Sequence, residues 1–424
     1  MKVAIIGGGS SYTPELLDGL FSRADALELF EICLYDVDRE RLEVVSGFCH
    51  RMAEARSSRV SLVHTLDLSE ALKDSSFVIA QVRVGGNAAR REDERLGMRH
   101  NLIGQETTGV GGFMKALRTV PEMIEIAKAM EKHSPHAFLI NFTNPSGIVT
   151  EALIKHSSVK VIGLCNIPVN FYIDVARAFS ASRQEVELDY IGLNHLSWVR
   201  RVQVAGKDVT GKILEWSDAP GRPANLEELD YPRGFVEALG MIPMHYLRYY
   251  YMTGMMIERQ RAKDKVRAEE VMEIESELMD IYRDPESREK PEMLSRRGGA
   301  HYSLAALELI ESICFDRGDV QVLDVKNHGA IPGLSPDAAI EVPCRVDSSG
   351  AVPLALAPPE PAIKGLMEAV KSYEELTVEA AVERDYDKAL LALAVHPLGP
   401  DADHAEEVLG DIIKTHGTDL RKER

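Results

Sequence analysis

Short apolar runs alternate with longer amphipathic stretches through the first 165 residues of the chain. The apolar runs are rich in β-branched residues and predict five strands: Lys2–Ile6, Glu31–Tyr35, Phe77–Val82, Phe138–Asn141 and Val159–Leu164. The stretches between them have helical spacing and predict four helices: Thr13–Leu29, Arg39–Glu54, Asn87–His100 and Val120–His133. Alternating strands and helices are typical of a doubly wound parallel α/β sheet.

The pattern changes after Cys165. A helix is predicted at Val169–Phe179, and strand-like runs then fill Leu188–Val204 without a helix between them, which indicates antiparallel sheet. The stretch Asp218–Arg233 is rich in Pro, Gly and charge and is predicted to be a surface loop. Helical spacing returns at Arg267–Tyr282, Ala300–Phe315, Asp385–Leu393 and Ala405–Lys414. We therefore predict a Rossmann-like domain at residues 1–168 and an α+β domain at residues 169–424.

Composition narrows the class of protein. With 45% hydrophobic and 27% charged residues over 424 positions, the chain is long and apolar enough for two folded cores. Its 67 acidic and 49 basic residues give a net charge of −18, which disfavours binding to nucleic acids or anionic membranes. Neither a membrane-spanning apolar run nor a signal peptide is predicted. The scattered cysteines favour a reducing, cytoplasmic compartment; they are Cys33, Cys49, Cys165, Cys314 and Cys344.

A glycine-rich turn follows the first predicted strand. Gly7, Gly8, Gly9 and Ser10 precede a helix, a geometry in which backbone N–H groups cradle a pyrophosphate. Asp36 ends the next strand, where its carboxylate would bind the ribose hydroxyls of NAD and repel the 2′-phosphate of NADP. The third glycine of the usual pattern is replaced by Tyr12, so a plain tight turn is the alternative interpretation.

Other candidate residues lie near predicted strand ends, each with a structural alternative. Cys165 ends a strand and His195 lies in a turn, but a spacing of 30 residues does not by itself indicate a metal site. Arg83, Arg90 and Arg91 follow the third strand and could bind a dianion, although acidic neighbours also fit a solvated helix face. The segment after Phe138–Asn141 is polar, and it could bind a ligand or cap the next helix through Thr143 or Asn144. Four tyrosines between positions 246 and 251 favour a core or a subunit interface.

Taken together, these segments resemble the NAD-dependent glycoside hydrolases of family 4. The motifs that carry the resemblance span nearly the whole chain: Gly7–Ser10 with Tyr12–Pro14, Arg83–Gly85, Gly104–Thr107, Asn141–Pro145, Cys165–Pro168, Gly192–His195, and Pro243 with Tyr246, Tyr249 and Tyr250. Asn166 follows the cysteine, and in this the chain resembles the 6-phospho-β-glucosidases. Family members that act on α-linked phosphosugars have an aspartate at that position.

The resemblance implies a role for each site residue. Cys165 and His195 would bind a divalent metal, usually Mn²⁺, and Tyr246 would be the catalytic base. Four residues would contact the substrate, a phosphorylated disaccharide or β-glucoside such as cellobiose 6-phosphate: Arg90, Asn144, Asn166 and Arg267. A homodimer or homotetramer is also implied.

The implied reaction begins with oxidation, outside the usual two-carboxylate scheme for glycosidases. NAD⁺ accepts the hydride from C3 of the sugar, Tyr246 removes the C2 proton, the aglycone leaves C1, water adds and the hydride returns. A tyrosine pKa near 10 would require a neighbouring cation, for which the metal, Arg248 and Arg267 are candidates.

Three alternatives remain open at this point. The chain could be a family 4 enzyme for α-linked or non-phosphorylated glycosides. It could be an NAD-dependent 2-hydroxy-acid dehydrogenase, which predicts a catalytic histidine paired with aspartate and no metal. It could also bind a nucleotide without catalysis, in which case the metal site would be structural.

Overall fold

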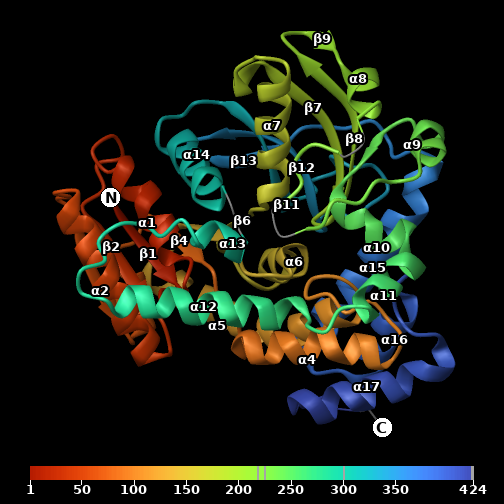
Figure 1. The fold of residues 1–424 in the computed structure, drawn as a ribbon, viewed down its shortest axis with the longest axis horizontal. Helices are drawn as coiled ribbons and strands as arrows, with labels where there is room; N and C mark the ends of the chain where they lie inside the picture. The colour runs from red at the N-terminus through yellow and green to blue at the C-terminus, as the bar shows by residue number, and fades with distance from the viewer. Residues whose placement is uncertain (217–218, 224–225, 299–300, 422–424) are drawn as a thin grey trace.

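The computed structural model describes residues 1–216, 219–223, 226–298 and 301–421 (Figure 1). A nine-stranded sheet forms its centre. The strands of this sheet are Lys2–Ile6 (β1), Glu31–Tyr35 (β2), Ser61–Thr65 (β3), Phe77–Ala80 (β4), Phe138–Asn141 (β5), Lys160–Gly163 (β6), Asp319–Lys326 (β11), Ala339–Asp347 (β12) and Gly350–Pro353 (β13). Their spatial order is β13-β12-β11-β6-β5-β4-β1-β2-β3.

Strands β1 to β6 are parallel and confirm the predicted doubly wound sheet. Their order, β3-β2-β1-β4-β5-β6, reverses direction between β1 and β4. Crossovers diverge on either side of such a reversal, so a crevice opens at the carboxyl ends of these two strands. The topology therefore places a ligand site after Ile6 and Ala80.

The two faces of this sheet are packed differently. Along β1, Val3 and Ile5 lie in one buried cluster, which contains α1. Ala4 and Ile6 lie in another, which contains α5 and α6. A sheet with helices on both faces has apolar residues at every position, because no face meets water. The helices of this half are Thr13–Ser22 (α1), Arg39–Ala55 (α2), Leu68–Leu72 (α3), Gly86–Arg99 (α4), Gly109–His133 (α5) and Ser146–His156 (α6).

Two predicted helices in this half have wrong bounds, and one strand was missed. Helix α1 ends at Ser22, not Leu29, and the chain continues through turns in which Glu28 has a φ of +48°. Helix α5 begins at Gly109 instead of Val120. Its glycines are required by close packing, since a Cβ on Gly111 would lie 2.1 Å from the Gln105 carbonyl oxygen. Strand β3 was not predicted, and only one of its five residues is buried.

The helix predicted at Val169–Phe179 is observed as Asn166–Ala178 (α7), and a smaller antiparallel sheet follows it, as predicted. The strands of the smaller sheet are Val186–Leu193 (β7), Leu196–Val204 (β8), Lys207–Asp208 (β9) and Ile242–Pro243 (β10). Strands β11 to β13 instead extend the large sheet through the pair Asp324–Gly163. The two halves of the chain therefore share one sheet.

The remaining helices surround these sheets. They are Asn166–Ala178 (α7), Arg183–Glu185 (η1), Thr210–Leu214 (α8), Arg233–Leu239 (α9), His245–Leu247 (η2), Arg248–Tyr251 (α10), Thr253–Arg261 (α11), Arg267–Arg283 (α12), Leu294–Arg297 (α13), Tyr302–Cys314 (α14), Pro361–Glu383 (α15), Tyr386–Val395 (α16) and Ala402–His416 (α17). The predicted loop at 218–233 lies partly outside the described residues, at 218, 224 and 225, and so does position 300 of the predicted helix Ala300–Phe315. The described remainder of 219–232 contains no helix or strand.

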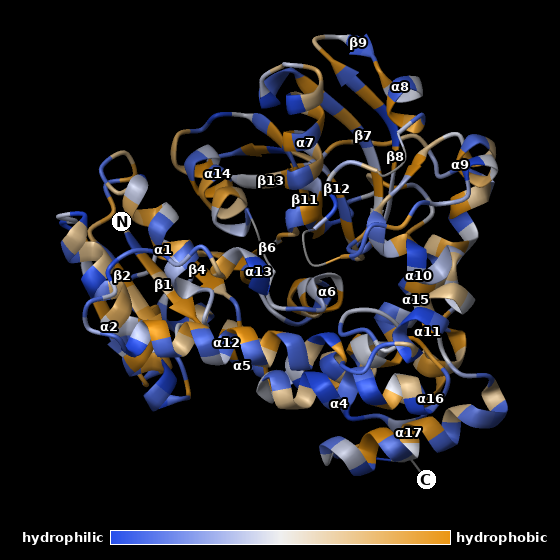
Figure 2. Ribbon diagram, viewed as in Figure 1, coloured by the Kyte–Doolittle hydropathy of each residue, from blue (hydrophilic) through white to orange (hydrophobic). Residues whose placement is uncertain are grey.

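Helix α12 joins the two halves on the side of the crevice. It comes from the second half but packs on α2 and α4 of the first, and it runs across the view in Figure 1. Figure 2 shows apolar β1 and β4 in orange and a largely hydrophilic α4 in blue. In the part of the chain that the structure describes, every helix is too short or too polar to cross a bilayer.

Candidate active site

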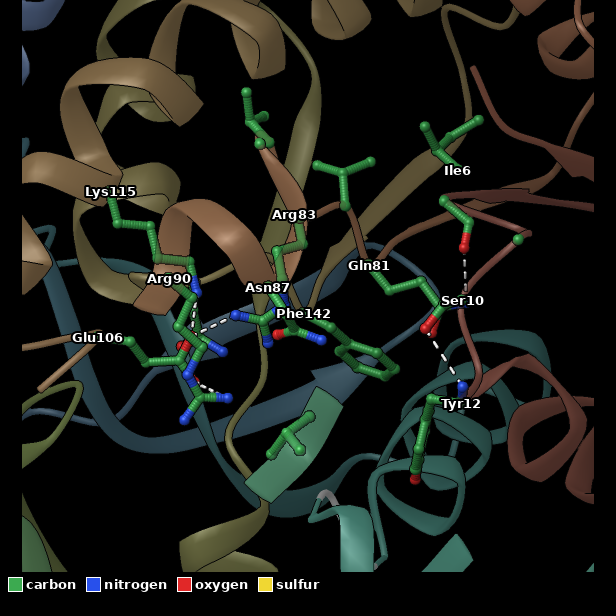
Figure 3. Close-up of a pocket in the computed structure, with 18 of the residues that line it drawn as sticks. Ile6, Ser10, Tyr12, Gln81, Arg83, Asn87, Arg90, Glu106, Lys115 and Phe142 are labelled. Carbon is green, nitrogen blue, oxygen red and sulfur yellow. Dashed lines mark hydrogen bonds and ion pairs between the residues drawn. The ribbon is translucent and has the colours of Figure 1, made fainter. Parts of the chain in front are cut away.

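A cavity of about 710 Å³ opens at the crevice between β1 and β4. Its lining comes from both halves of the chain, with the glycine loop at one end and Tyr246, His195 and Arg90 among the rest. Such a volume is in the range of small-molecule and cofactor sites. In Figure 3, Ser10 and Tyr12 lie at one end, and Arg90, Glu106 and Lys115 gather at the other.

The glycine loop is held tightly against the end of β4. Gly7 has a φ of +90°, and a Cβ on it would lie 2.9 Å from the Gln81 carbonyl oxygen, so a side chain is excluded there. The N–H groups of Gly7 and Gly8 both donate to the carbonyl of Tyr35. These contacts fix the loop as a close wall of the cavity, as a pyrophosphate cradle requires.

Asp36 lies at the end of β2, as predicted. Its Oδ2 accepts a hydrogen bond from the Gly9 N–H at 2.8 Å, and its Oδ1 accepts one from the Asp38 N–H at 3.1 Å. The carboxylate therefore borders the cavity in a fixed orientation. Tyr12, which replaces the third glycine, packs edge-on against Tyr302 with ring centroids 6.3 Å apart.

Tyr246 and His195 are stacked at the other end of the cavity. Their ring centroids are 3.8 Å apart and their planes differ by 7°. His195 lies in the turn between β7 and β8, as predicted, with a φ of +63°. The Tyr246 hydroxyl makes no hydrogen bond to any residue that the structure describes, and its half-buried side chain lines the cavity. It is thus available to a ligand.

Cys165 precedes α7 and is buried near Tyr246. Burial and the carboxyl groups of Glu341 and Asp324 raise its pKa, while the Ile167 N–H and the Asn194 side chain lower it. Without a cation the group is a neutral thiol. It lies close enough to Tyr246 for a thiolate there to raise the tyrosine's pKa.

The donor chemistry of Cys165 and His195 fits a divalent metal. Burial lowers the pKa of His195 to about 3, so its imidazole is neutral and can donate a lone pair. Thiolate and imidazole suit several first-row ions. Among the described residues, no group of three or more His, Cys, Asp and Glu side chains is placed to bind a metal. A metal on these two ligands would therefore keep coordination positions for substrate oxygens.

Arg90 belongs to a buried cluster of charges. Its Nε contacts Glu94 Oε1 at 2.8 Å and its Nη1 contacts Glu106 Oε1 at 3.2 Å. Glu106 also bonds Arg83 and, at 2.7 Å, Lys115. The alternative of a solvated helix face is wrong for Arg90, which is buried (8% exposed), whereas Arg91 is half-buried.

The cluster leaves positive charge in the cavity. Burial alone would raise the pKa of Glu106, but Arg83, Arg90 and Lys115 hold it well below its usual value. Burial lowers the pKa of Lys115 to about 7. The basic side chains of Arg83, Arg90 and Lys115 thus outnumber the acidic ones of Glu94 and Glu106, an arrangement that favours an anionic ligand.

The cation expected beside Tyr246 is Arg90. Burial raises the pKa of Tyr246, while Arg90 acts to lower it. Arg248, one candidate from the sequence, instead donates to the carbonyls of His245 and Glu227. Arg267 contacts Glu270 at 2.8 Å and the Arg296 carbonyl at 3.1 Å.

The remaining predicted residues also reach the cavity. Asn144, Asn166 and Arg267 all line it. The alternative that Thr143 or Asn144 caps the next helix is wrong, because α6 has no side-chain cap and Thr143 Oγ1 accepts from the Val82 N–H at 3.1 Å. Tyr249 is buried in an apolar cluster, which supports the core interpretation for that part of the tyrosine stripe.

A carboxylate that sequence reasoning missed, Glu275 of α12, closes the cavity from above the glycine loop. Its Oε1 accepts from the Ser11 hydroxyl at 2.7 Å and from Arg297 Nη2 at 3.1 Å, and its Oε2 accepts from Asn87 Nδ2 at 2.8 Å. Burial alone would raise the pKa of Glu275, but Arg297 and Arg41 lower it to about 2. This ionised group ties α12 across the cavity.

Glu106 and Lys115 were also missed as functional residues. Glu106 lay within a motif that carried the resemblance but was assigned no role. Lys115 is a single charge in the apolar run Val110–Leu117, and that isolation was the available signal. A lysine that is 2% exposed on an apolar helix face requires a buried carboxylate.

Family models match both halves of the chain. The family 4 glycosyl hydrolase model matches residues 2–181, and the model of the C-terminal domain of that family matches residues 190–399. The probable 6-phospho-beta-glucosidase of Bacillus subtilis is 40% identical, covering 98% of this chain and 96% of its own. The 6-phospho-beta-glucosidase BglT of Thermotoga maritima is 40% identical, covering 98% of each chain. A 6-phospho-alpha-glucosidase of Leptotrichia buccalis is 30% identical, covering 98% of this chain and 97% of its own.

Solved structures agree with these matches. The 6-phospho-beta glucosidase from Thermotoga maritima, with manganese, NAD⁺ and glucose-6-phosphate, superposes with a TM-score of 0.90 at 38% identity, covering 99% of this chain and 100% of the other. Malate dehydrogenase from Plasmodium falciparum superposes with a TM-score of 0.54 at 13% identity, covering 90% and 99%. The second likeness shows a shared fold alone, and it confirms the predicted fold class.

Proposed function

The chain belongs to family 4 of the glycosyl hydrolases, and on that premise we propose that it hydrolyses 6-phospho-β-glucosides with NAD and a divalent metal, Mn²⁺, as cofactors. One observation carries the proposal. A single cavity joins the glycine loop and Asp36 to Tyr246, His195 and Arg90. A cofactor at one end and a sugar at the other would then share one enclosed space.

The chain offers residues for both cofactors. The glycine loop, Gly7, Gly8, Gly9 and Ser10, would bind the pyrophosphate of NAD and Asp36 its ribose. His195, which lines the cavity, and the buried Cys165 would bind the metal. When bound, NAD⁺ supplies a reversible acceptor for the hydride at C3, and the metal supplies positive charge for the oxygens at C2 and C3. The hydride returns in each cycle, so the net reaction is hydrolysis.

Tyr246 would remove the proton from C2. Tyr246 lines the cavity, its hydroxyl has no hydrogen-bond partner among the described residues, and its ring is held by the stack on His195 at 3.8 Å. A general base must be held in position with an atom free to accept the proton. Arg90 stabilises the phenolate that accepts the proton.

Substrate selection would depend on charge and on Asn166. Arg90 lies in a cluster with excess positive charge, and Arg267 and Asn144 line the same cavity, which fits a phosphorylated sugar. Asn166 has no carboxyl proton to donate, whereas the resemblance assigns aspartate to enzymes for α-linked phosphosugars. A 6-phospho-β-glucoside is therefore favoured over its α-anomer.

The dehydrogenase alternative predicts a histidine paired with aspartate. His195 Nδ1 instead contacts the Thr107 hydroxyl at 2.8 Å. The family membership of the chain also disfavours that alternative.

Four chromogenic substrates test this proposal. The 4-nitrophenyl α- and β-D-glucosides, each with and without a 6-phosphate, would be supplied to reduced enzyme with NAD⁺ and Mn²⁺. We expect the highest kcat/KM for the phosphorylated β-anomer, because remote phosphate binding stabilises the transition state. Preference for the α-anomer or for the unphosphorylated glucosides would contradict the assignment.

We also propose that the enzyme acts in the cytoplasm as a homodimer or homotetramer. The described cysteines are all free, in agreement with a reducing compartment.

A further inference from the structure

Thr107 lines the cavity and is the middle member of a short polar chain that runs from Gln105 to His195. It belongs to the segment that joins α4 to α5. Its hydroxyl is 2.8 Å from His195 Nδ1 and 2.9 Å from Gln105 Oε1. The Thr107 backbone N–H also donates to Gln105 Oε1, at 2.6 Å.

These three contacts determine the direction of each hydrogen bond. The backbone N–H can only donate, so the Gln105 atom that it meets is the amide oxygen. Two oxygens 2.9 Å apart need one hydrogen between them, and an amide oxygen has none. The Thr107 hydroxyl therefore donates to Gln105, and its lone pair is left for His195.

His195 must then donate from Nδ1. A neutral imidazole has one N–H, and placing it on Nδ1 leaves Nε2 with a free lone pair. Nε2 has no hydrogen-bond partner among the residues that the structure describes. The stack on Tyr246 at 3.8 Å restrains the same ring across its face.

We propose that Gln105 and Thr107 form a relay that fixes His195 as the Nδ1-protonated tautomer and prepares Nε2 to bind the divalent metal. The inference rests on the proposed function, which makes His195 a metal ligand. Metal-binding histidines commonly use their second nitrogen in this way, with a carboxylate, carbonyl or water as the acceptor. Here a hydroxyl is the acceptor, and Gln105 orients it. Gln105 and Thr107 are thus positioning residues.

The affinity for Mn²⁺ tests the relay. Isothermal titration calorimetry on reduced, metal-free, full-length protein with saturating NAD⁺ would compare the wild type with Thr107→Val, which keeps the shape of the side chain but removes the acceptor. We expect Mn²⁺ to bind about 10- to 100-fold more weakly, the usual effect of losing such a partner. Thr107→Ser keeps the hydroxyl. We expect its affinity for Mn²⁺ to lie within about threefold of the wild type, in contrast to the 10- to 100-fold loss expected for Thr107→Val.

A neighbouring residue provides a matched control. Thr108 has a hydroxyl that lies 3.1 Å from the Tyr250 hydroxyl and not against His195, so Thr108→Val removes the same group one position away. We expect its Mn²⁺ affinity to be unchanged. Wild-type affinity in Thr107→Val would overturn the relay, and so would an equal loss in Thr107→Ser or Thr108→Val.

The tautomer itself is measurable without any change at Thr107. Protein labelled with ¹⁵N-histidine and free of metal would give long-range ¹H–¹⁵N correlations, and His195→Asn would identify the signals of His195. A protonated Nδ1 and an unprotonated Nε2 are expected, and the reverse pattern would overturn the inference. If the wild type bound no Mn²⁺, the metal in the proposed function would fail, but the tautomer measurement would still decide the relay.

Discussion

Replacing Tyr246 with phenylalanine removes one oxygen from the centre of the site. The hydroxyl makes no hydrogen bond to a described residue, and the ring contact with His195 uses only the ring, so Tyr246→Phe breaks no protein contact. We expect the free energy of unfolding to change by less than about 1 kcal/mol. Any loss of activity would then report chemistry instead of folding.

The expected loss of activity is large. A phenol with a pKa of 10 is ionised in roughly one molecule in 300 at pH 7.5, and burial raises the pKa of Tyr246 further. As the proposed base, Tyr246 would therefore depend on cationic support from Arg90 and the metal. General bases contribute about 10²- to 10⁴-fold in rate, so we expect kcat to fall by that factor, equivalent to about 3–5 kcal/mol.

The assay combines turnover with isotope exchange. Hydrolysis of 4-nitrophenyl β-D-glucoside 6-phosphate in D₂O would be followed by absorbance, and deuterium at C2 of the product by NMR. The wild type is expected to incorporate deuterium, and Tyr246→Phe to lose both turnover and exchange while its affinity for NAD⁺ stays unchanged. If the variant kept kcat within threefold of the wild type, Tyr246 would not be the base.

Three further changes test other parts of the site. Asp36→Ala removes the carboxylate that accepts a hydrogen bond from the Gly9 N–H. We expect calorimetry to show NAD⁺ binding about 5- to 30-fold more weakly and NADP⁺ binding more tightly. An unchanged preference for NAD⁺ over NADP⁺ would contradict the assignment of Asp36 to the ribose. Arg90→Lys replaces the planar guanidinium, whose Nε and Nη1 contact Glu94 and Glu106, with a shorter group that lacks this fork. We expect kcat/KM for the phosphorylated substrate to fall about 10- to 100-fold, and equal kinetics would remove Arg90 from substrate binding. Glu275→Gln should destabilise the protein by about 3 kcal/mol at pH 7, because the pKa of Glu275 falls from 4.5 to about 2 on folding. A carboxyl group whose pKa is lowered on folding stabilises the folded protein above pH 4.5, and this stabilisation is lost as the pH falls toward 2. The difference in the free energy of unfolding between the wild type and Glu275→Gln, measured in urea, must therefore be smaller at pH 3.5 than at pH 7. A pH-independent difference would be inconsistent with this origin.

Much of the fold could be predicted from the sequence, because a buried strand is a short run of apolar residues. The bounds of β1, β2 and β5 were predicted correctly, since each is a short apolar run between polar turns. The edge strand Ser61–Thr65 was missed because most of its side chains face solvent. The 23-residue helix Pro361–Glu383 was also missed, and its pairing with α16 depends on contacts between segments that no local pattern reveals. A domain division at residue 168 stays a prediction.

Several candidate site residues were predicted because they lie at or just after the end of a predicted strand. Asp36, Cys165 and Asn144 follow this rule, and the structure brings the first and third into one cavity with Tyr246 and His195. Glu275 was not predicted, because it is one glutamate among several on α12 and only the fold places it over the glycine loop. Networks of this kind depend on contacts across 264 positions, as between Ser11 and Glu275, which spacing cannot report.

The requirement for both cofactors is the most direct test of the account. Reduced, metal-stripped protein would be assayed with 4-nitrophenyl β-D-glucoside 6-phosphate, with NAD⁺ and Mn²⁺ added separately and together while absorbance at 340 nm records NADH. The account predicts hydrolysis only when both are present, with no accumulation of NADH. Stoichiometric NADH would indicate a dehydrogenase, and full turnover without either cofactor would contradict oxidation at C3 as the first step.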